Sequence, residues 1–206
     1  GEYGEGDRFL GVVVPDVRAV AKKNLFASLF DIEALLGSPW HEARLCALII
    51  LVQQSRKSVP KEVFEFYLSH TSGINNWDLV DLTAPSIVGG YLLENPQERE
   101  RLYSLADSTL LWEQRIAIVS TLTLIRNGEF NDTYSLAVKL MSHKHDLMHK
   151  AVGWMLREAG KRDRRRLELF LDEYATSMPR RHARHITVPV NYKMNIAVIF
   201  NCARVL

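Results

Sequence analysis

Two stretches of this sequence share an order of residue types, and together they decide the fold: Trp40-His41-Glu42-Ala43-Arg44-Leu45-Cys46-Ala47 and Trp112-Glu113-Gln114-Arg115-Ile116-Ala117. In both, a tryptophan is followed three or four residues later by an arginine, and then by a small residue. The four tryptophans stand at positions 40, 77, 112 and 154, which gives spacings of 37, 35 and 42 residues. A period of about 34–47 residues with two helices in each period is typical of HEAT-like solenoids. The sequence therefore predicts an all-α solenoid of antiparallel helix pairs.

The rest of the chain supports this prediction, because apolar residues recur at helical spacing almost everywhere after Pro15. Pro15 suits the first turn of a helix, and Asn75 or Asn76 suits a helix N-cap. Further helices are expected to begin at Ser38-Pro39 and after Ser58-Val59-Pro60, with later ones over about 96–107, 109–126, 130–142, 145–160 and 163–176. Short breaks are expected between helices at Gly73, Gly89-Gly90, Asn127-Gly128, His143 and Gly160.

The two ends of the sequence depart from the helical pattern. We expect one domain over residues 1–206, with a glycine-rich loop at 1–14 that lacks the motifs of a nucleotide site. Residues 186–206 mix β-branched residues with a proline, which leaves open an irregular end or a final docked helix. The sequence starts at Gly1 without a signal peptide, which is consistent with a trimmed chain.

The composition is that of an ordinary globular protein, with 47% apolar and 24% charged residues. No stretch approaches a membrane span, and two cysteines, Cys46 and Cys202, exclude a disulfide scaffold and fit a reducing cytosol. The formal net charge is only +2, but residues 150–206 hold 12 Lys and Arg against 5 Asp and Glu. This excess, concentrated in 161–166 and 180–185, indicates a polyanion-facing end; the alternative is a solvated helix face.

The segment Asn75-Asn76-Trp77-Asp78-Leu79-Val80-Asp81 carries the clearest chemical signal. Trp77 and Asp81 are four residues apart, so on a helix they share a face one turn apart. A carboxylate beside an aromatic plane suits the stabilisation of a cationic centre. The alternative for Asp81 is an ion pair with an arginine of the next repeat, and Asp78 fits a first-turn carboxylate that favours the helix dipole.

Two further tryptophan–arginine pairs are spaced three residues apart, Trp112 with Arg115 and Trp154 with Arg157. Arginine at the edge of an aromatic cleft suits phosphate binding, although tryptophans at repeat spacing are more often part of a core. The sequence also carries His143, His145 and His149, but no HExxH motif and no further ligand nearby, so we expect no metal and no cofactor.

At these residues the sequence resembles the AlkD-like DNA alkylation repair glycosylase family, which has HEAT-like repeats. The resembling stretches cover about residues 1–185: Gly6-Asp7-Arg8-Phe9-Leu10-Gly11-Val12 with Pro15-Asp16-Val17-Arg18, Asn76–Asp81, Leu111–Ala117 and Lys150–Glu158. The resemblance implies excision of N3- or N7-alkylated purines from duplex DNA. It also implies that Asp81 is the catalytic carboxylate, that Trp77 and Trp154 flank the sugar of the lesion, and that Arg115 holds a nearby phosphate.

The sequence therefore predicts a metal-free glycosylase, expected to be a monomer in the cytoplasm at the nucleoid, with no membrane partner. Arg157, Arg180 and Arg181 are further candidates for contacts to DNA phosphate. Two alternatives stay open: a non-catalytic relative that binds DNA, and a HEAT scaffold whose groove binds a protein partner.

Overall fold

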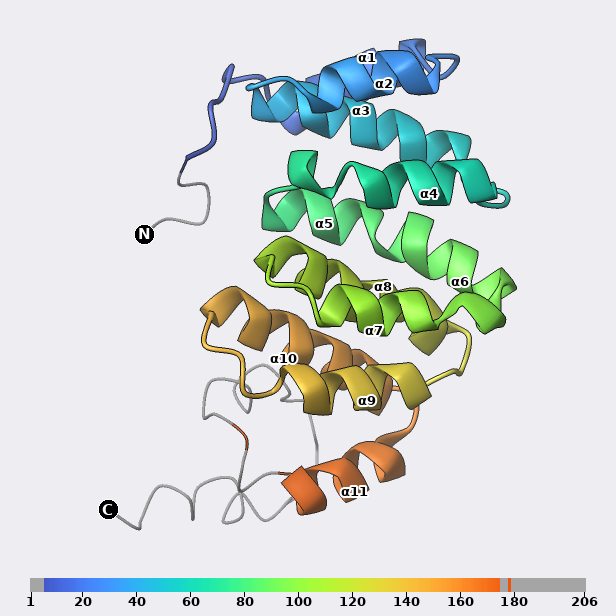
Figure 1. Ribbon diagram of the computed structural model, residues 1–206, viewed down its shortest axis with the longest axis vertical. Helices are drawn as coiled ribbons and strands as arrows, with labels where there is room; N and C mark the ends of the chain where they lie inside the picture. The colour runs from blue at the N-terminus through green and yellow to red at the C-terminus, as the bar shows by residue number, and fades with distance from the viewer. Residues whose placement is uncertain (1–5, 175–177, 179–206) are drawn as a thin grey trace.

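The computed structural model describes residues 6–174 and residue 178, and every regular element in this part of the chain is helical (Figure 1). The α-helices in chain order are α1 (Val14–Lys23), α2 (Leu29–Leu36), α3 (His41–Gln54), α4 (Lys61–Ser69), α5 (Trp77–Thr83), α6 (Gly90–Glu94), α7 (Glu100–Ala106), α8 (Leu111–Arg126), α9 (Asn131–Leu140), α10 (Asp146–Gly160) and α11 (Arg164–Tyr174). Short 3-10 helices lie at η1 (Thr71–Gly73) and η3 (Pro96–Glu98), and a π-helical turn lies at η2 (Pro85–Gly89).

The helices stack in two layers that follow the chain from α1 to α11 (Figure 1). One layer, the inner one, consists of α3, the continuous unit α5–η2–α6, α8 and α10, and each of these four contacts the next. Helices α4, α7 and α9 form the second layer and pack against one side of the first. The N-terminal ends of α3, α5, α8 and α10 lie along one edge of the stack, and residues 6–13 run past the same edge (Figure 1). The all-α solenoid of antiparallel helix pairs predicted from the sequence is confirmed.

The core lies between the two layers and explains why the inner helices are apolar on most of their surface. In α8, every residue from Arg115 to Leu122 is buried, and in α3 the same holds from Leu45 to Leu51. A helix that neighbours cover on both sides needs apolar residues nearly all round, whereas α1, α4 and α9 bury only one stripe. The inner helices are thus packed against neighbours on most sides, and they carry Trp77, Asp81, Arg115 and Trp154.

A single kinked helix runs from Trp77 to Glu94 through α5, η2 and α6. The N–H of Gly89 bonds to the carbonyl of Ala84, five residues back, at 2.9 Å. Pro85 has no N–H to donate, which is one of the ordinary causes of such an irregularity. The carbonyl of Pro85 instead accepts from Thr123 Oγ1 of α8 at 2.5 Å, so the kink is fastened to the neighbouring inner helix.

The prediction that Gly89-Gly90 separates two helices is therefore wrong, since both residues lie inside this kinked helix. A side chain at Gly89 would collide with the backbone carbonyl of Ser120 and stand 3.0 Å from the Cβ of Thr123, both in α8. The glycine is present because the two helix backbones approach closely, and not because the helix ends there.

Other elements differ from their predicted form in smaller ways. Helix α2 was not predicted, although Ser28 and Asp31 form a reciprocal capping box at its start. The helix predicted over 96–107 begins as the 3-10 turn η3. Trp40, Trp77 and Trp112 all lie at the N-terminal end of an inner helix, but Trp154 lies in the middle of α10, so its spacing does not mark an equivalent repeat position.

Several parts of the sequence-based description lie outside the described residues: residues 1–5 of the predicted loop, the basic run 180–185, the irregular segment 186–206 and the last residues of the helix predicted over 163–176. The single domain over 1–206 stays a prediction. Among the helices that the structure describes, none combines the length and the apolar character needed to cross a membrane.

Gly89 and Gly90 offer a matched test of the close approach between η2 and α8. Gly89→Ala is expected to lower the free energy of unfolding by about 1–3 kcal/mol, because the added methyl group meets backbone that cannot move aside. Gly90→Ala places its methyl 3.2 Å from a Val59 methyl group, which can adjust, and gains helix propensity of about 1 kcal/mol. Urea unfolding of both variants measures the difference; equal stabilities would contradict the close approach.

Candidate active site

The N-terminal turn of α5 presents Trp77 and Asp81 on one face, as the spacing predicted. Asn76 caps this helix: its side-chain oxygen accepts the N–H of Trp77 at 2.7 Å. Trp77 is the first residue of the helix and remains 40% exposed, an unusual position for so large an aromatic ring. Asp81 lies one turn further on, with 19% of its side chain exposed. The helix therefore offers an accessible indole and a partly shielded carboxylate side by side.

Asp81 is held by Arg115 of α8 in a two-pronged ion pair. Arg115 Nε donates to one carboxylate oxygen at 2.9 Å and Nη2 donates to the other at 2.8 Å. Nη1 donates to the backbone carbonyl of Leu147 at 2.5 Å, which ties the same guanidinium to α10. The arginine side chain is only 5% exposed. The ion pair between repeats that the sequence left open for Asp81 is thus present, and it fixes the direction of the carboxylate.

Burial and the ion pair act on the charge of Asp81 in opposite directions. Burial raises the pKa of the Asp81 carboxyl, the Arg115 guanidinium lowers it, and the nearby Asp78 raises it again. The resulting pKa lies above the ordinary value for an aspartate. A partly desolvated carboxylate interacts more strongly with a positive charge than a hydrated one does, because the local dielectric is lower.

The structure shows Arg115 in contact with Asp81, in addition to the phosphate contact that the resemblance implies. Three of its five N–H donors are used within the protein, and the residue is buried. The contact seen is with Asp81, so a phosphate contact of Arg115 stays a prediction. Sequence spacing could not distinguish the two roles, because it does not show which way a side chain 34 residues away points.

The remaining predicted site residues lie on α8, on α10 and beyond. Trp112 and Trp154 are half-buried against the core. Trp154 follows Leu147, whose backbone carbonyl accepts from Arg115, by seven residues, or about two turns along α10. Arg157 is half-buried, and its Nε has no hydrogen-bond partner in the described part of the chain. Arg180 and Arg181 lie outside the described residues.

A buried polar network joins Asp7 to α3 and α5, and the residue spacing did not predict it. Asp7 accepts hydrogen bonds from Arg44 Nη2 at 2.6 Å and Asn76 Nδ2 at 2.7 Å, and its Oδ2 lies 3.0 Å from His41 Nδ1. His41 Nε2 lies 2.8 Å from Asp78 Oδ2. These partners are up to 69 residues apart. The available signal was a histidine and an arginine at the start of an otherwise apolar helix.

The network changes the charge states of its members. The hydrogen bond to Asp78 and the charges of both aspartates raise the pKa of His41 above its usual value, although burial opposes this. Burial alone would raise the pKa of Asp7, but its bonds to Asn76 and His41 and the charge of Arg44 lower it overall. Asp78 also accepts the N–H of Leu79 at 2.9 Å, in line with its predicted place in the first turn of α5.

Most cations in the described basic run are paired within the protein. Lys161 and Arg162 contact Glu158, Arg164 contacts Glu168, and Arg166 lies 5.0 Å from the centre of the Tyr134 ring. These pairs fit the solvated helix face that is one of the two interpretations of residues 161–166, and a polyanion-facing role of this run stays a prediction.

The three histidines near α10 have structural roles. The ring of His145 caps α10 by accepting the N–H of Leu147, and His149 Nε2 bonds to the carbonyl of His143. In the part of the chain that the structure describes, no three His, Cys, Asp or Glu side chains gather as metal ligands would.

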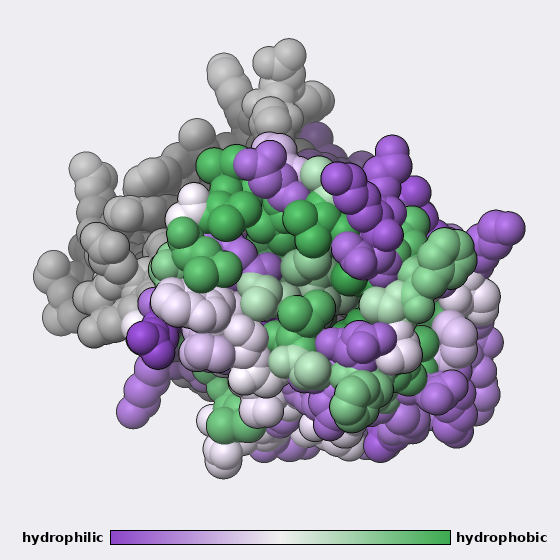
Figure 2. All heavy atoms as spheres, turned by 90° about the horizontal axis from the view of Figure 1, so that it is seen from above, coloured by the Kyte–Doolittle hydropathy of each residue, from purple (hydrophilic) through white to green (hydrophobic). Residues whose placement is uncertain are grey.

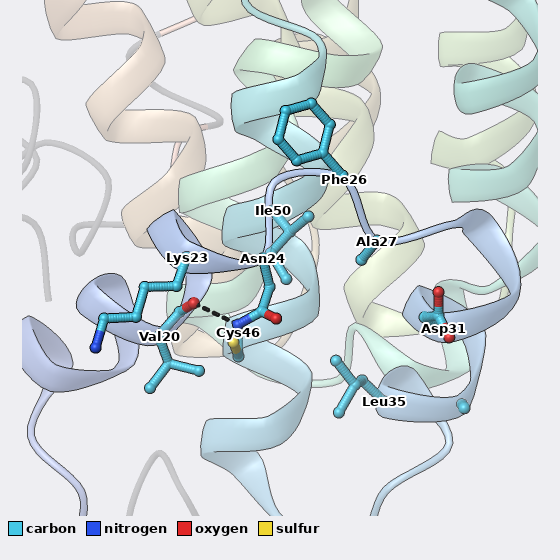
Figure 3. Close-up of a pocket in the computed structure, with 10 residues that line it drawn as sticks. Val20, Lys23, Asn24, Phe26, Ala27, Asp31, Leu35, Cys46 and Ile50 are labelled. Carbon is cyan, nitrogen blue, oxygen red and sulfur yellow. Dashed lines mark hydrogen bonds between the residues drawn. The ribbon is translucent and has the colours of Figure 1, made fainter.

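A shallow groove lies between α1 and α2 over α3, at the end of the stack (Figure 3). It is lined by residues such as Val20, Phe26 and Leu35, and none of the candidate site residues is among them. Apolar side chains gather on this end of the molecule (Figure 2), where Phe26 and Phe30 are exposed.

The fold and this geometry define a class of protein: an all-helical solenoid that presents a paired carboxylate and exposed tryptophan at one edge of its stacked helices. A solved structure described as a "predicted DNA alkylation repair enzyme from Enterococcus faecalis" has the same fold, with a TM-score of 0.77 and 19% sequence identity over 92% of this chain and 91% of that one. The chain belongs to the DNA alkylation repair enzyme family, whose sequence model matches residues 2–185. No curated protein gives a significant match.

Family membership confirms the resemblance seen in the sequence and supports a role in the repair of alkylated DNA.

The charge state of His41 leads to a prediction about stability and pH. Because the folded pKa of His41 is raised, its contribution to stability is fully present below its unfolded pKa of about 6.5 and is lost as pH rises through the folded value. The difference in unfolding free energy between the wild type and His41→Gln is therefore expected to be largest in mild acid and to shrink in alkali. Urea unfolding across this pH range measures it; a difference that grows with pH would contradict the ion pairs of His41.

Proposed function

We propose that this protein is a monofunctional DNA glycosylase that hydrolyses the N-glycosidic bond of cationic N3- or N7-alkylated purines in duplex DNA. The observation that carries the proposal is the Asp81 carboxylate, aimed by Arg115 and standing one turn from the exposed Trp77. Membership of the family supports a role in the repair of alkylated DNA in general. The chemistry of a cationic leaving base supports the narrower assignment as a glycosylase.

An alkylated purine of this kind already carries a positive charge, so it leaves without a general acid. Ordinary glycosidases need two carboxyl groups, one of them to protonate the leaving group. Here a single carboxylate is sufficient. This matches a site in which Asp81 is partly buried and bonded to Arg115, while the nearest other carboxylate on α5, that of Asp78, is bonded to His41.

Departure of the base leaves the deoxyribose close to an oxocarbenium ion, and Asp81 is suited to stabilise that charge. At about 4 Å and an effective dielectric of about 20, one unit of charge is attracted by roughly 4 kcal/mol. Only the part of this energy that grows between the ground state and the transition state accelerates the reaction. That part is worth up to about a thousandfold in rate. Asp81 also serves to orient the attacking water.

Arg115 acts in this scheme as a positioning residue. Its bidentate contact leaves the carboxylate little freedom to rotate, and its bond to the Leu147 carbonyl fixes the guanidinium against α10. The Arg115 charge also favours the ionised form of Asp81, which burial disfavours. The site therefore keeps a charged carboxylate in a partly buried position, with its orientation fixed by Arg115.

The tryptophans supply surfaces for the sugar and the base. The indole of Trp77 offers its negative π face to a cationic group from the first residue of α5, next to Asp81. Trp154 on α10 is proposed as the second aromatic wall. Arg157, Arg180 and Arg181 are proposed to contact phosphates. The protein is proposed to act as a monomer on duplex DNA in the cytoplasm, at the nucleoid, without cofactor or metal.

Asp81→Asn tests the role of the carboxylate directly. The amide keeps the shape and loses the charge, so release of free 7-methylguanine from methylated DNA is expected to fall by about 100- to 1000-fold while DNA binding is roughly kept. Asp107→Asn is the matched control, since that carboxylate is 66% exposed and is paired with Lys139 in another repeat. Unchanged release from the Asp81→Asn protein would exclude this role of Asp81, whereas absence of release by the wild-type protein would favour a non-catalytic DNA-binding relative.

The raised pKa of Asp81 predicts the acid side of the pH–rate profile. The ionised carboxylate is the active form, so the rate falls as pH is lowered through the pKa of Asp81. Because this pKa lies above the ordinary aspartate value of about 3.9, the loss is expected to begin at a higher pH than for an exposed aspartate. Single-turnover release of 7-methylguanine across the acid range measures the profile, with circular dichroism to verify folding; a flat profile would contradict the role of Asp81.

A further inference from the structure

Residues 7–12, called here the pinned segment, are held against α3 by two buried anchors. The Asp7 side chain, 7% exposed, bonds to His41, Arg44 and Asn76 at one end of the segment. At the other end, the buried Glu42 carboxylate accepts the N–H groups of Leu10, Gly11 and Val12 at 2.8, 2.9 and 3.3 Å. Between them, the carbonyl of Arg8 accepts the N–H of His41 at 2.8 Å. The pinned segment has no regular secondary structure, but these hydrogen bonds to buried carboxylates give it a defined conformation.

The side chains that this segment presents outward are unusual for a fixed surface loop. Phe9 is 52% exposed and Leu10 is 53% exposed. Arg8 is also exposed, and its guanidinium lies over the Trp40 ring at 5.0 Å from the ring centre. No carboxylate in the described part of the chain forms an ion pair with Arg8. The pinned segment thus presents the oriented guanidinium of Arg8 to solvent, next to the exposed side chains of Phe9 and Leu10.

The pinned segment is continuous with the candidate active site. The Phe9 ring lies 5.0 Å from the His41 ring, and His41 bonds to Asp78, which directly follows Trp77. Trp40 and Trp77 occupy the same end of successive inner helices, on the edge that residues 6–13 pass in Figure 1. Packed helices lie about 8–10 Å apart, which corresponds to about three base pairs along a duplex.

We propose that Arg8 and Phe9 form a second contact to duplex DNA, about three base pairs from the nucleotide at Asp81. Arg8, oriented by Trp40, binds a backbone phosphate, and Phe9 lies against the sugar side of the minor groove. Proteins that bind the minor groove combine arginine with apolar side chains such as phenylalanine, which they often insert between base steps. The inference rests on the proposed function only in that the partner is DNA, and it needs no base excision.

Arg8→Gln tests the phosphate contact through its salt dependence. Loss of one phosphate contact is expected to reduce the slope of log affinity against log salt by about 0.9, and to weaken binding roughly five- to tenfold at about 0.1 M salt. The measurement is fluorescence anisotropy of a labelled, unmodified duplex at several salt concentrations. Arg56→Gln is the matched control, because Arg56 is an exposed arginine just beyond the opposite end of α3.

Phe9→Ser tests the apolar contact separately. It removes no charge, so binding is expected to weaken while the salt slope stays that of the wild type. An unchanged affinity and slope in Arg8→Gln would overturn the proposal, as would equal losses in Arg8→Gln and Arg56→Gln. If the wild-type protein released no base from methylated DNA while Arg8→Gln weakened binding, the glycosylase assignment would fail and this contact would stand.

Discussion

The contact between Asp81 and Arg115 is the constraint around which the described structure is arranged. One guanidinium joins three successive inner helices, because it holds the Asp81 carboxylate of α5 from its place in α8 and bonds to the Leu147 carbonyl of α10. A buried charge pair of this kind is costly to break, since removal of one partner leaves the other unpaired away from water. The same contact therefore aligns the repeats and aims the proposed catalytic group, so stability and activity depend on the same atoms.

The fold was largely predictable because its signal is periodic. Tryptophan–arginine segments and helical apolar spacing indicated stacked helix pairs, and the four-residue spacing of Trp77 and Asp81 placed both on one helix face. Trp154 shows the limit of this reasoning: its spacing from Trp112 resembled a repeat, yet it lies in the middle of α10 and not at its start. Regular spacing predicts which face of a helix a residue occupies. It does not predict how far along the helix that residue lies.

The site was less predictable, because its contacts join residues far apart in sequence. The spacing of Asp81 and Arg115 was compatible with an ion pair and also with a carboxylate and a phosphate ligand that do not touch. The ion pair became evident only from the directions of the two side chains. The bonds of His41 to Asp7 and Asp78 left no periodic trace at all. Gly89 misled for a different reason: a missing side chain can mark a helix end or a close approach of two backbones, and the sequence looks the same in both cases.

The π-helical turn at η2 has a consequence for how the two ends of its helix are related. A π turn accommodates about one residue more than an α-helical turn, and each residue of an α-helix rotates the chain by about 100°. The direction in which Trp77 and Asp81 point is therefore offset from the direction set by α6. Deleting one residue between Pro85 and Gly89 would rotate α5 relative to α6 by about that angle, which is incompatible with the contact between Asp81 and Arg115. The π-helical turn thus sets the orientation of the helix face that carries Trp77 and Asp81.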